Sequence, residues 1–586
     1  MISVKPHILT LLGGVLLGSL SLSAVAQAPS ELYRNAQTAT HGTARAQGMG
    51  GAVGAVGADP SAILVNPAGL AMYSTNILSL TLDPGWGNAT VDWRGNLIAN
   101  NTLERKSVSY RMGNLANAAV VTPLLQNYSG GSLVNINLSF VYDRAYNYSR
   151  KYDMITGPLM QHSFADYLAA RAIASGFSPK ELMATEDYDP LTLPGVDPLA
   201  VMGLNSYLIE GKADGAFMDA LGRKHYPYRN NIGLTFVPNS GDKNKLQLIH
   251  PIGSNLKVQE NGARHDMDFA MGMTIGDYVQ LGASLRIGTV SNSKNALYRE
   301  DYYDESKDYN GEEFINDSHF VYNYGIRSYG SSFGINIGAM FMLGEWGRLG
   351  ISYLTPQYLH MREVFSAQVE SYNATYRGDE KSSYNTQEME SAYSMIIPGR
   401  LTVSAAGLLG RYGMVSYDME WTPLSTMRML QNNQEITSVT DIVRQDYGHQ
   451  LTHRVGIEVL PYQGLSVRAG FSYTGNPMRN PELRQQPEGG LSIDPGVSGV
   501  DHSFTLPRTY TSYSGGIGYR VNSYFGVDIA YVRQVQKQKV YAFGGYEFDA
   551  GNTTSNGEPI IEHIDAFGGT LKQVSNNIVA TATLYF

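Results

Sequence analysis

The sequence predicts an all-β fold: a transmembrane antiparallel β-barrel of about 14 strands, with an N-terminal plug and a helical extracellular insertion. Three observations predict it. Apolar residues alternate with small or polar residues through many segments, which is typical of strands that face two different environments. Several of these segments run for ten residues or more, roughly the length that a tilted strand needs to cross a bilayer. The turns between them alternate between short and long.

The composition argues against several other classes of protein. No cysteine occurs among the 586 residues, so a disulfide framework is excluded. Beyond residue 26 no run of about twenty apolar residues occurs, so we expect no membrane-spanning helix. The net charge of -9 is spread along the chain without a basic stripe, which argues against binding of nucleic acid. The 12 histidines show no metal-ligand spacing, and we expect neither a metal nor a cofactor.

The first element, residues 1–26, is predicted to be a secretory signal peptide. It contains Lys5, an apolar run of about fifteen residues from Ile8, and the small residues Ala24-Val25-Ala26. The apolar run is too short for a dependable membrane-spanning helix. We therefore expect the protein to be exported, with cleavage after Ala26.

The second element, residues 27–75, is predicted to fill the barrel, and we call it the plug. Residues 48–70 read GMGGAVGAVGADPSAILVNPAGL and carry too little side chain to form a core of their own. Glycine lets one backbone lie close to another in a confined space. A barrel of about fourteen strands is too wide to be filled by its own inward side chains, so the barrel wall would supply the core around the plug.

Residues 76–586 are predicted to form the barrel. Between Phe269 and Ile287, for example, the odd positions are apolar and the even ones small or polar, on both sides of a tight turn at Gly276-Asp277. The predicted strands are 76–83, 105–113, 135–150, 261–275, 278–300, 327–343, 348–370, 394–408, 412–421, 448–460, 464–474, 509–521, 524–543 and 571–586. Because the short turns of such barrels are periplasmic and the long loops external, the loop lengths also orient the barrel.

The longest connection, residues 151–260, is predicted to be an ordered external insertion that is partly helical. Ser163 with Asp166 forms a capping box before HSFADYLAARAIASGF, and Ser178-Pro179-Lys180-Glu181 forms a second one. Asp197-Pro198 begins a third helix, with proline at the first helical position. These starting signals favour a structured cap.

The small-residue stretch of the plug resembles the N-terminal hatch of the FadL-type outer-membrane transporters of long-chain fatty acids and other hydrophobic compounds. The pattern is ARAxGMGGA, followed by a run that ends in NPAGL. It is carried by Ala44, Arg45, Gly48, Gly50, Gly51, Ala52, Asp59, Ala62, Asn66, Pro67, Ala68 and Gly69. At the level of architecture, the likeness extends over the whole mature chain.

This resemblance implies a mode of transport. An apolar ligand would be captured in a groove between external loops and would pass to a pocket inside the barrel. Movement of the hatch would then open a lateral route into the membrane near a kinked third strand. Gly48, Gly50, Gly51, Asn66, Pro67 and Ala68 would be the hatch and gating residues. In this chain the third predicted strand, NINLSFVYDRAYNY, contains no glycine or proline to mark a kink.

Two arginines are candidates for binding the charged group of a ligand. Arg286 and Arg454 fall on the lumen-facing register, where a cation can hold a carboxylate. The alternative is ordinary pairing between neighbouring strands, because the register places Asp268 opposite Arg286 and Glu458 near Arg468.

Apolar side chains of the insertion are candidates for lining the groove through which a ligand enters. They are Phe164, Leu168, Leu199 and Met202. The alternative is packing between the helices of the insertion. Asn66-Pro67-Ala68 likewise is either a moving latch or a turn that leads into the first strand.

Two further motifs have simpler interpretations. The acidic segment 299–314 has its glycine in the wrong place for a calcium-binding EF-hand, so we interpret it as a solvated external loop. Arg377-Gly378-Asp379 spells an adhesion tripeptide in a predicted external loop. A barrel hydrolase would need a Ser-His-acid or Asp-His constellation, and we expect no enzymatic activity.

The sequence therefore predicts passive import of hydrophobic small molecules, such as long-chain fatty acids, across the outer membrane of a Gram-negative bacterium. The expected partners are the ligand, outer-membrane lipid and lipopolysaccharide, and the barrel-assembly machinery, which would recognise the last strand ending at Phe586. Two alternatives stay open: a general porin for polar solutes, and a surface adhesin.

Overall fold

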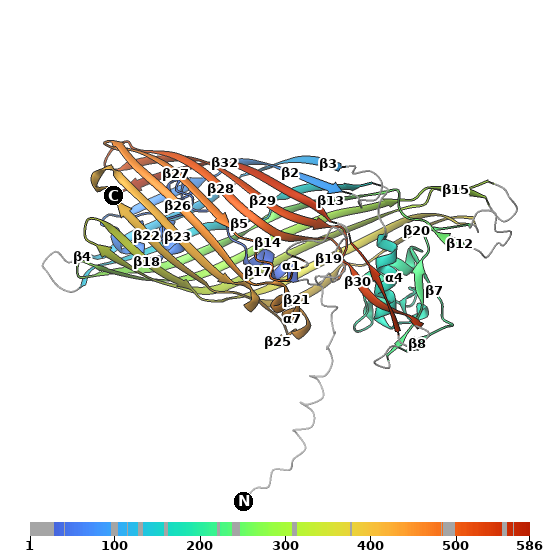
Figure 1. The fold of residues 1–586 in the computed structure, drawn as a ribbon. Coiled ribbons are helices and arrows are strands. Elements are labelled where there is room, and N and C mark those ends of the chain that lie inside the picture. The colour runs from blue at the N-terminus through green and yellow to red at the C-terminus, as the bar shows by residue number, and fades with distance from the viewer. Residues whose placement is uncertain are drawn as a thin grey trace, which may run out of the picture.

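In the computed structural model the strands close into one antiparallel barrel (Figure 1). The structure describes residues 29–39, 41–94, 103–113, 115–126, 133–157, 162–218, 223–236, 246–307, 313–375, 378–481, 483, 499–553, 559–566 and 568–586. The expected signal peptide, residues 1–26, lies outside these ranges. Within them, none of the helices combines the length and the apolar character needed to span a membrane.

The barrel has 14 strands, several of which continue after a short break, and the fold class predicted from the sequence is confirmed. Their segments are β1 Ile77–Leu82 with β2 Gly85–Arg94, β3 Leu103–Met112 with β4 Leu115–Gln126, β5 Leu133–Asn147 with β6 Arg150–Thr156, β13 Gly253–Ile275, β14 Val279–Asp301, β17 His319–Leu343, β18 Gly347–Leu354 with β19 Gln357–Thr375, β21 Met389–Ile397 with β22 Arg400–Leu408, β23 Gly413–Pro423 with β24 Arg428–Gln431, β26 His449–Tyr462, β27 Leu465–Thr474, β28 Phe504–Arg520, β29 Phe525–Tyr541 and β32 Gly569–Tyr585. The first and last strands pair from Ile77 with Tyr585 to Leu82 with Ala580, which closes the wall.

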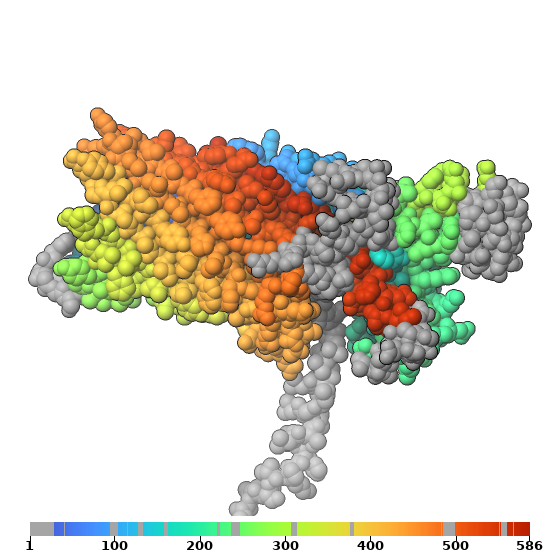
Figure 2. All heavy atoms as spheres, viewed as in Figure 1, coloured from blue at the N-terminus to red at the C-terminus, as the bar shows by residue number. Residues whose placement is uncertain are grey.

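The alternation seen in the sequence separates an apolar outer face from the lumen. On β1, Leu78, Leu80 and Leu82 are exposed on the outside, whereas Ser79 and Thr81 are buried toward the inside. Figure 2 shows the outer surface of the wall that the later strands form. Because closure pairs every strand with two neighbours, such a wall can lie in hydrocarbon without an unpaired edge at that depth.

Several strands are far longer than a bilayer crossing needs. β13 has 23 residues, and at roughly 3.3 Å per residue it is about 75 Å long, whereas about 9–11 residues cross a membrane. Toward the start of β13 the outward residues become polar, as Lys257 and Gln259 show, whereas Phe269 and Met271 face outward further along. The wall therefore extends beyond its apolar band, toward the long connections.

The plug lies inside the ring of strands. Its elements are α1 Pro29–Ala36, α2 Ala44–Gly48, α3 Ala62–Val65 and η1 Pro67–Met72. The side chains of Ile63, Leu64 and Leu70 pack in one cluster with Val121 and Val141 of the wall. The wall thus supplies the core around a segment that has little side chain of its own.

The insertion is shorter than the predicted range 151–260. The third and fourth barrel strands continue into this range, because β6 and β13 pair with each other there. Their pairing runs from Ser254 with Thr156 to Glu260 with Arg150. The insertion, which we call the cap, therefore comprises residues 157–252. Its described elements are α4 Phe164–Ser175, α5 Pro179–Leu182, η2 Pro190–Thr192, α6 Pro198–Asn205, β7 Ile209–Gly211, β8 Phe217–Met218, β9 Lys224–His225, β10 Tyr228–Asn230, β11 Leu234–Phe236 and β12 Leu246–Leu248.

The helices of the cap begin at the predicted signals. Ser163 and Asp166 form a reciprocal capping box at α4, and Ser178 and Glu181 form another at α5. The Asp197 side chain accepts the Leu199 N–H at the start of α6. A hairpin from a later loop, formed by β30 Tyr546–Thr553 and β31 Pro559–Ile564, lies against the cap (Figure 2). The remaining elements are η3 Gly410–Tyr412, η4 Leu424–Thr426, α7 Thr437–Asp446, β15 Asp304–Lys307, β16 Glu313–Asn316, β20 Gly378–Asn385 and β25 Gln434–Glu435.

Candidate functional site

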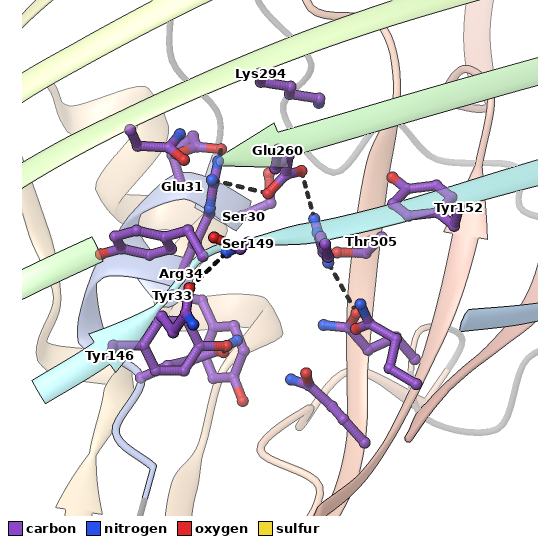
Figure 3. A pocket seen from close by; sticks show the side chains of 18 of the residues that line it. Ser30, Glu31, Tyr33, Arg34, Tyr146, Ser149, Tyr152, Glu260, Lys294 and Thr505 are labelled. Atoms are coloured by element: carbon purple, nitrogen blue, oxygen red, sulfur yellow. Dashed lines mark hydrogen bonds and ion pairs between the residues drawn. The ribbon is translucent and has the colours of Figure 1, made fainter. Parts of the chain in front are cut away.

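A cavity of about 140 Å³ lies where the plug helix α1 meets the wall and the loop before β28. Its lining comes from α1, from the second to seventh barrel strands, and from β28, β29 and β32. Figure 3 shows side chains of these elements converging on one space. Segments far apart in sequence therefore build it together.

Charged groups at this cavity form a buried network around Glu260 of β13. Arg34 of the plug lies 2.8 Å from one Glu260 oxygen (Figure 3), and Arg150 of β6 lies 2.7 Å from the other. Arg34 also pairs with Glu31 at 3.2 Å. Burial opposes the charge of Arg34, but the neighbouring carboxylates of Glu260 and Glu31 raise its pKa above the ordinary value. The network fixes the plug to the wall beside the cavity.

Tyrosines form much of the remaining surface. The guanidinium of Arg34 lies over the Tyr148 ring at 4.9 Å, and that of Arg150 lies over Tyr152 at 5.4 Å. The Tyr148 hydroxyl donates to Asn35 Oδ1 of the plug at 3.1 Å. Ring faces and their polar tips thus both meet this space, which suits a ligand that is partly apolar.

The wall beside the cavity contains a break in its hydrogen bonding. β2 pairs with β3 along its whole length, and β4 pairs with β5 as far as Asn117 with Asp143. Beyond the pair of Asn117 with Asp143, no strand pairing joins β3 to β6 in the described part of the chain. The two sides approach each other through Asn147 Nδ2 and Met112 Sδ, 3.5 Å apart, and both residues line the cavity. We call this break the wall gap.

The third barrel strand is interrupted at the wall gap, although it contains no glycine or proline. β5 ends at Asn147 and β6 begins at Arg150. The Tyr148 N–H donates to the carbonyl of Gly262, which has φ +143° in the neighbouring strand β13. The glycine that permits the irregular pairing therefore lies on the fourth strand and not within the third.

The predicted hatch residues lie where the plug meets the wall. Asn66 donates to the carbonyl oxygens of Gly54 at 2.9 Å and Ala339 at 3.1 Å, and its Oδ1 accepts the Ala68 N–H. Pro67 begins η1, and the side chain of Asn137 on the third barrel strand donates to the carbonyls of Leu70 and Tyr73. Asn66 thus joins two parts of the plug to β17. Whether Asn66-Pro67-Ala68 moves as a latch stays a prediction.

The glycines of the plug lie close to the opposite side of the wall. Gly50 has φ +66°, and its N–H donates to Ser514 Oγ at 3.2 Å. Gly51 also has a positive φ, of +79°. Gly48 accepts at its carbonyl from the Ser514 hydroxyl at 3.1 Å. Gly48 and Gly50 therefore lie at the side of the plug that touches β27 and β28.

Arg286 and Arg454 are both occupied by neighbouring carboxylates. Arg286 lies 3.1 Å from Asp268, directly across the strand pair, and donates to the carbonyl of Leu64 in the plug at 3.0 Å. Arg454 lies 2.9 Å from Glu420. The cross-strand pair of Glu458 with Arg468 is also present, at 2.6 Å. Neither Arg286 nor Arg454 lines the cavity, and binding of a ligand carboxylate by them stays a prediction.

The apolar cap residues Phe164, Leu168, Leu199 and Met202 are all buried in one cluster. Phe164 packs on His502, with ring centroids 4.6 Å apart. Packing between the cap helices, the alternative interpretation, describes this arrangement. A ligand would reach these four side chains only if the cap opened.

The remaining motifs add no site. The acidic segment 299–314 contains β15 and the start of β16, which pair with each other, and part of it lies outside the described residues. Among the residues that are described, no group of three or more potential metal ligands occurs. Arg377 of the adhesion tripeptide lies outside the described residues, and Gly378 begins β20.

The residues that line the cavity escaped the sequence analysis. Arg34 and Glu31 are two of the few charged residues in the plug, and a charge in an otherwise uncharged, enclosed segment signals a buried partner. Glu260 was assigned to the insertion, although it continues β13. Its alternation with outward polar residues is the only signal that it faces the lumen.

The closed wall of even strand number, apolar outside and plugged inside, is that of a bacterial outer-membrane barrel. Its neighbours in fold are FadL-type barrels. A FadL homologue of Pseudomonas aeruginosa superposes with a TM-score of 0.44 at 13% identity, over 93% of this chain and 99% of that one. The CymD monoaromatic hydrocarbon channel gives 0.40 at 12%, over 93% and 98%. The toluene transporter TbuX of Ralstonia pickettii gives 0.39 at 13%, over 93% and 99%.

No protein-family model matches the chain, and no curated protein matches it. The similarity to the FadL-type barrels therefore concerns the course of the chain. The arrangement of the cavity and the wall gap rests on the strand pairings and side-chain contacts of this protein itself.

Proposed function

We propose that this protein passively imports hydrophobic small molecules across the outer membrane and releases them sideways through the wall gap. The observation that carries the proposal is the position of the cavity, which lies between the plug and the unpaired edges of β3 and β6. A ligand held there is next to the part of the wall where no strand pairing joins β3 to β6, while the plug lies in the lumen. This arrangement would let an apolar ligand pass from the cavity through the wall into lipid.

The filled lumen argues against a general porin. Helix η1 contacts β5, β13, β14 and β17, while α2 contacts β27, β28, β29 and β32. The plug therefore touches both sides of the wall. The plug thus lies in the path that a polar solute would take, whereas a porin keeps a continuous aqueous channel.

The position of the wall gap along the strands, relative to the apolar band of the barrel, supports release into the outer part of the bilayer. Phe140 of β5 is exposed on the outer face, and paired Phe269 of β13 is exposed beside it. The last pair of the β4–β5 ladder contains Asp143, which follows Phe140 closely in sequence. The wall gap therefore begins at the edge of the apolar band. An apolar molecule that moves from there into lipid avoids exposing its surface to water, which costs roughly 25 cal/mol per Å².

A reversible cross-link across the wall gap tests the proposal. The chain contains no cysteine, so Met112→Cys with Asn147→Cys supplies two unique thiols. A short, reducible bis-methanethiosulfonate linker would join the end of β3 to the end of β5 across the wall gap. We expect it to block uptake of radiolabelled toluene by cells that lack other transporters of this compound, and we expect reduction to restore uptake.

Two controls make the result specific. Thr90→Cys with Ser107→Cys places the same linker across β2 and β3, which are already paired at these residues, and uptake should continue. A monofunctional thiol reagent on the Met112→Cys, Asn147→Cys protein adds bulk without joining the strands. Unchanged uptake after cross-linking of the wall gap would refute lateral release.

A further inference from the structure

Every cation at the cavity already has an acidic partner. Arg34 and Arg150 both pair with Glu260, and Lys294 of β14 lies 2.7 Å from Asp501. Glu31 and Glu363 add further carboxylates to the lining. An anionic ligand would have to displace one of these carboxylates and leave it buried, at a large cost in free energy. The charges of the cavity therefore disfavour a carboxylate headgroup.

Two buried amide oxygens at the cavity have no donor. Asn292 of β14 is 7% exposed and Gln573 of β32 is 6% exposed. Asn292 Oδ1 and Gln573 Oε1 both lack a hydrogen-bond partner among the residues that the structure describes, and both side chains line the cavity. A buried acceptor without a donor is unfavourable. A ligand that carries a hydroxyl or an N–H group would supply the missing donor.

The size of the cavity and its aromatic lining favour a ring. An engineered protein cavity of about 150 Å³ holds one benzene molecule, and this cavity measures about 140 Å³. Tyr33, Tyr110, Tyr146 and Tyr510 are among the aromatic residues that line it. Ring faces and edges of tyrosine pack well against a second aromatic ring. A long alkyl chain would not fit without a change in the plug or the cap.

We propose that this cavity binds a neutral compound of one aromatic ring that carries a hydrogen-bond donor, as a phenol does. The ring would lie among the tyrosines, and the donor would reach Asn292 Oδ1 or Gln573 Oε1. The inference rests on the proposed import function, since it names the class of molecule that the same cavity takes. It differs from a fatty-acid site because the cavity offers no unpaired cation to a carboxylate.

Three compounds that each contain one aromatic ring test the hydrogen-bond donor and the charge separately. 4-Fluorophenol is neutral at pH 7 and carries a donor, 4-fluoroanisole lacks the donor, and 4-fluorobenzoate is an anion. Their 19F signals can be titrated with the full-length protein in detergent micelles. The variants Asn292→Leu and Gln573→Leu remove the acceptors. Gln280→Leu is the control, because Gln280 Oε1 is also buried without a partner but lies outside the cavity lining.

We expect 4-fluorophenol to bind the unchanged protein and the Gln280→Leu control, and to lose about tenfold in affinity in Asn292→Leu or Gln573→Leu. We expect 4-fluoroanisole to bind more weakly than 4-fluorophenol and 4-fluorobenzoate to show no specific binding. Signals that are the same for all variants measure partition into the micelle and are subtracted. Retention of heat-resistant migration on gels shows that each variant has folded.

Two outcomes overturn the proposal. Equal specific binding of 4-fluoroanisole and 4-fluorophenol would mean that the acceptors play no part. Stronger binding of 4-fluorobenzoate would mean that the cavity selects an anion. If the wall cross-link still blocks uptake of toluene in either case, the import function stands and only the ligand class falls.

Discussion

Gly470 of strand β27 lies directly against Gly50 of the plug, so that a Cβ added at Gly470 would be 2.7 Å from the Cα of Gly50. The reverse also holds, since a Cβ at Gly50 would be 2.6 Å from the backbone nitrogen of Phe471. Wall and plug therefore touch backbone to backbone. Glycine on both sides is what lets a narrow plug close a wide barrel.

This contact predicts that Gly470→Ala loosens the plug. Because the methyl group would overlap the backbone of the plug, we expect the free energy of unfolding to fall by about 1–3 kcal/mol and the conductance in planar bilayers to rise. Gly407→Ala is the matched control, since a Cβ at Gly407 of β22 meets no atom within 4 Å. A Gly470→Ala protein that matches this control in both measurements would contradict the role of the contact.

Removal of the central plug should open the lumen. We expect the intact protein to give little steady conductance, because the plug touches both sides of the wall. Deletion of residues 42–70 removes these contacts, and a wall of this many strands then encloses an aqueous channel. Single-channel recording in planar bilayers measures the difference. A large steady conductance of the intact protein would favour the porin alternative instead.

The ion network beside the cavity predicts a large effect of Glu260→Gln. The substitution leaves Arg150 without its carboxylate and Arg34 with Glu31 alone, in a buried place where the Glu260 side chain is 1% exposed. We expect a loss of about 3–5 kcal/mol in the free energy of unfolding, measured by urea titration in lipid vesicles. Asp92→Asn breaks the exposed pair with Arg105 and should cost at most about 1 kcal/mol. Equal effects of the two would show that the network adds nothing.

His502 predicts a pH dependence of stability. Burial among Phe164, Tyr322 and Tyr324 lowers the pKa of His502 to about 4, although a hydrogen bond to the Ala542 carbonyl favours the protonated form. In the unfolded chain its pKa is about 6.5. Between these values the unfolded state binds a proton that the folded state does not, so stability falls as the pH drops from about 6.5 to about 4.

The size of this effect and its control follow from the same shift. Each pKa unit corresponds to about 1.4 kcal/mol, so His502 should account for about 3 kcal/mol of lost stability at pH 4. His502→Asn keeps a donor but does not titrate. Urea unfolding at pH 7 and pH 4.5 should therefore show a smaller pH difference in the variant than in the unchanged protein. The same pH difference in both would assign the dependence to other groups.

Much of the barrel could be predicted from local patterns. The alternation through Phe269 and Met271 assigns these side chains to the outside, because a strand has a period of two whatever surrounds it. The capping boxes at Ser163 and Ser178 likewise mark helix starts, since the side chain bonds to a backbone group three residues away. Bounds were less certain, and the third and fourth barrel strands extend well into the range assigned to the insertion.

The candidate site could not be predicted in the same way. Arg34, Arg150 and Glu260 meet because the plug enters the barrel and β6 pairs with β13. The sequence indicated that Arg286 faces the lumen and lies opposite Asp268. It did not indicate that the Arg286 guanidinium would also donate a hydrogen bond to the Leu64 carbonyl of the plug. Gly262 explains the break in the third strand only once the neighbouring strand is known.

The sequence by itself determined that this chain forms two-faced strands around a small-residue plug, because those signals lie within a few neighbouring residues. Only the tertiary structure decided which lumen residues meet and where the wall is unpaired. Those contacts depend on the register of every strand around the closed barrel and on the depth of the plug. Neither quantity is encoded in a local pattern, because a contact across the lumen joins residues that hundreds of positions separate.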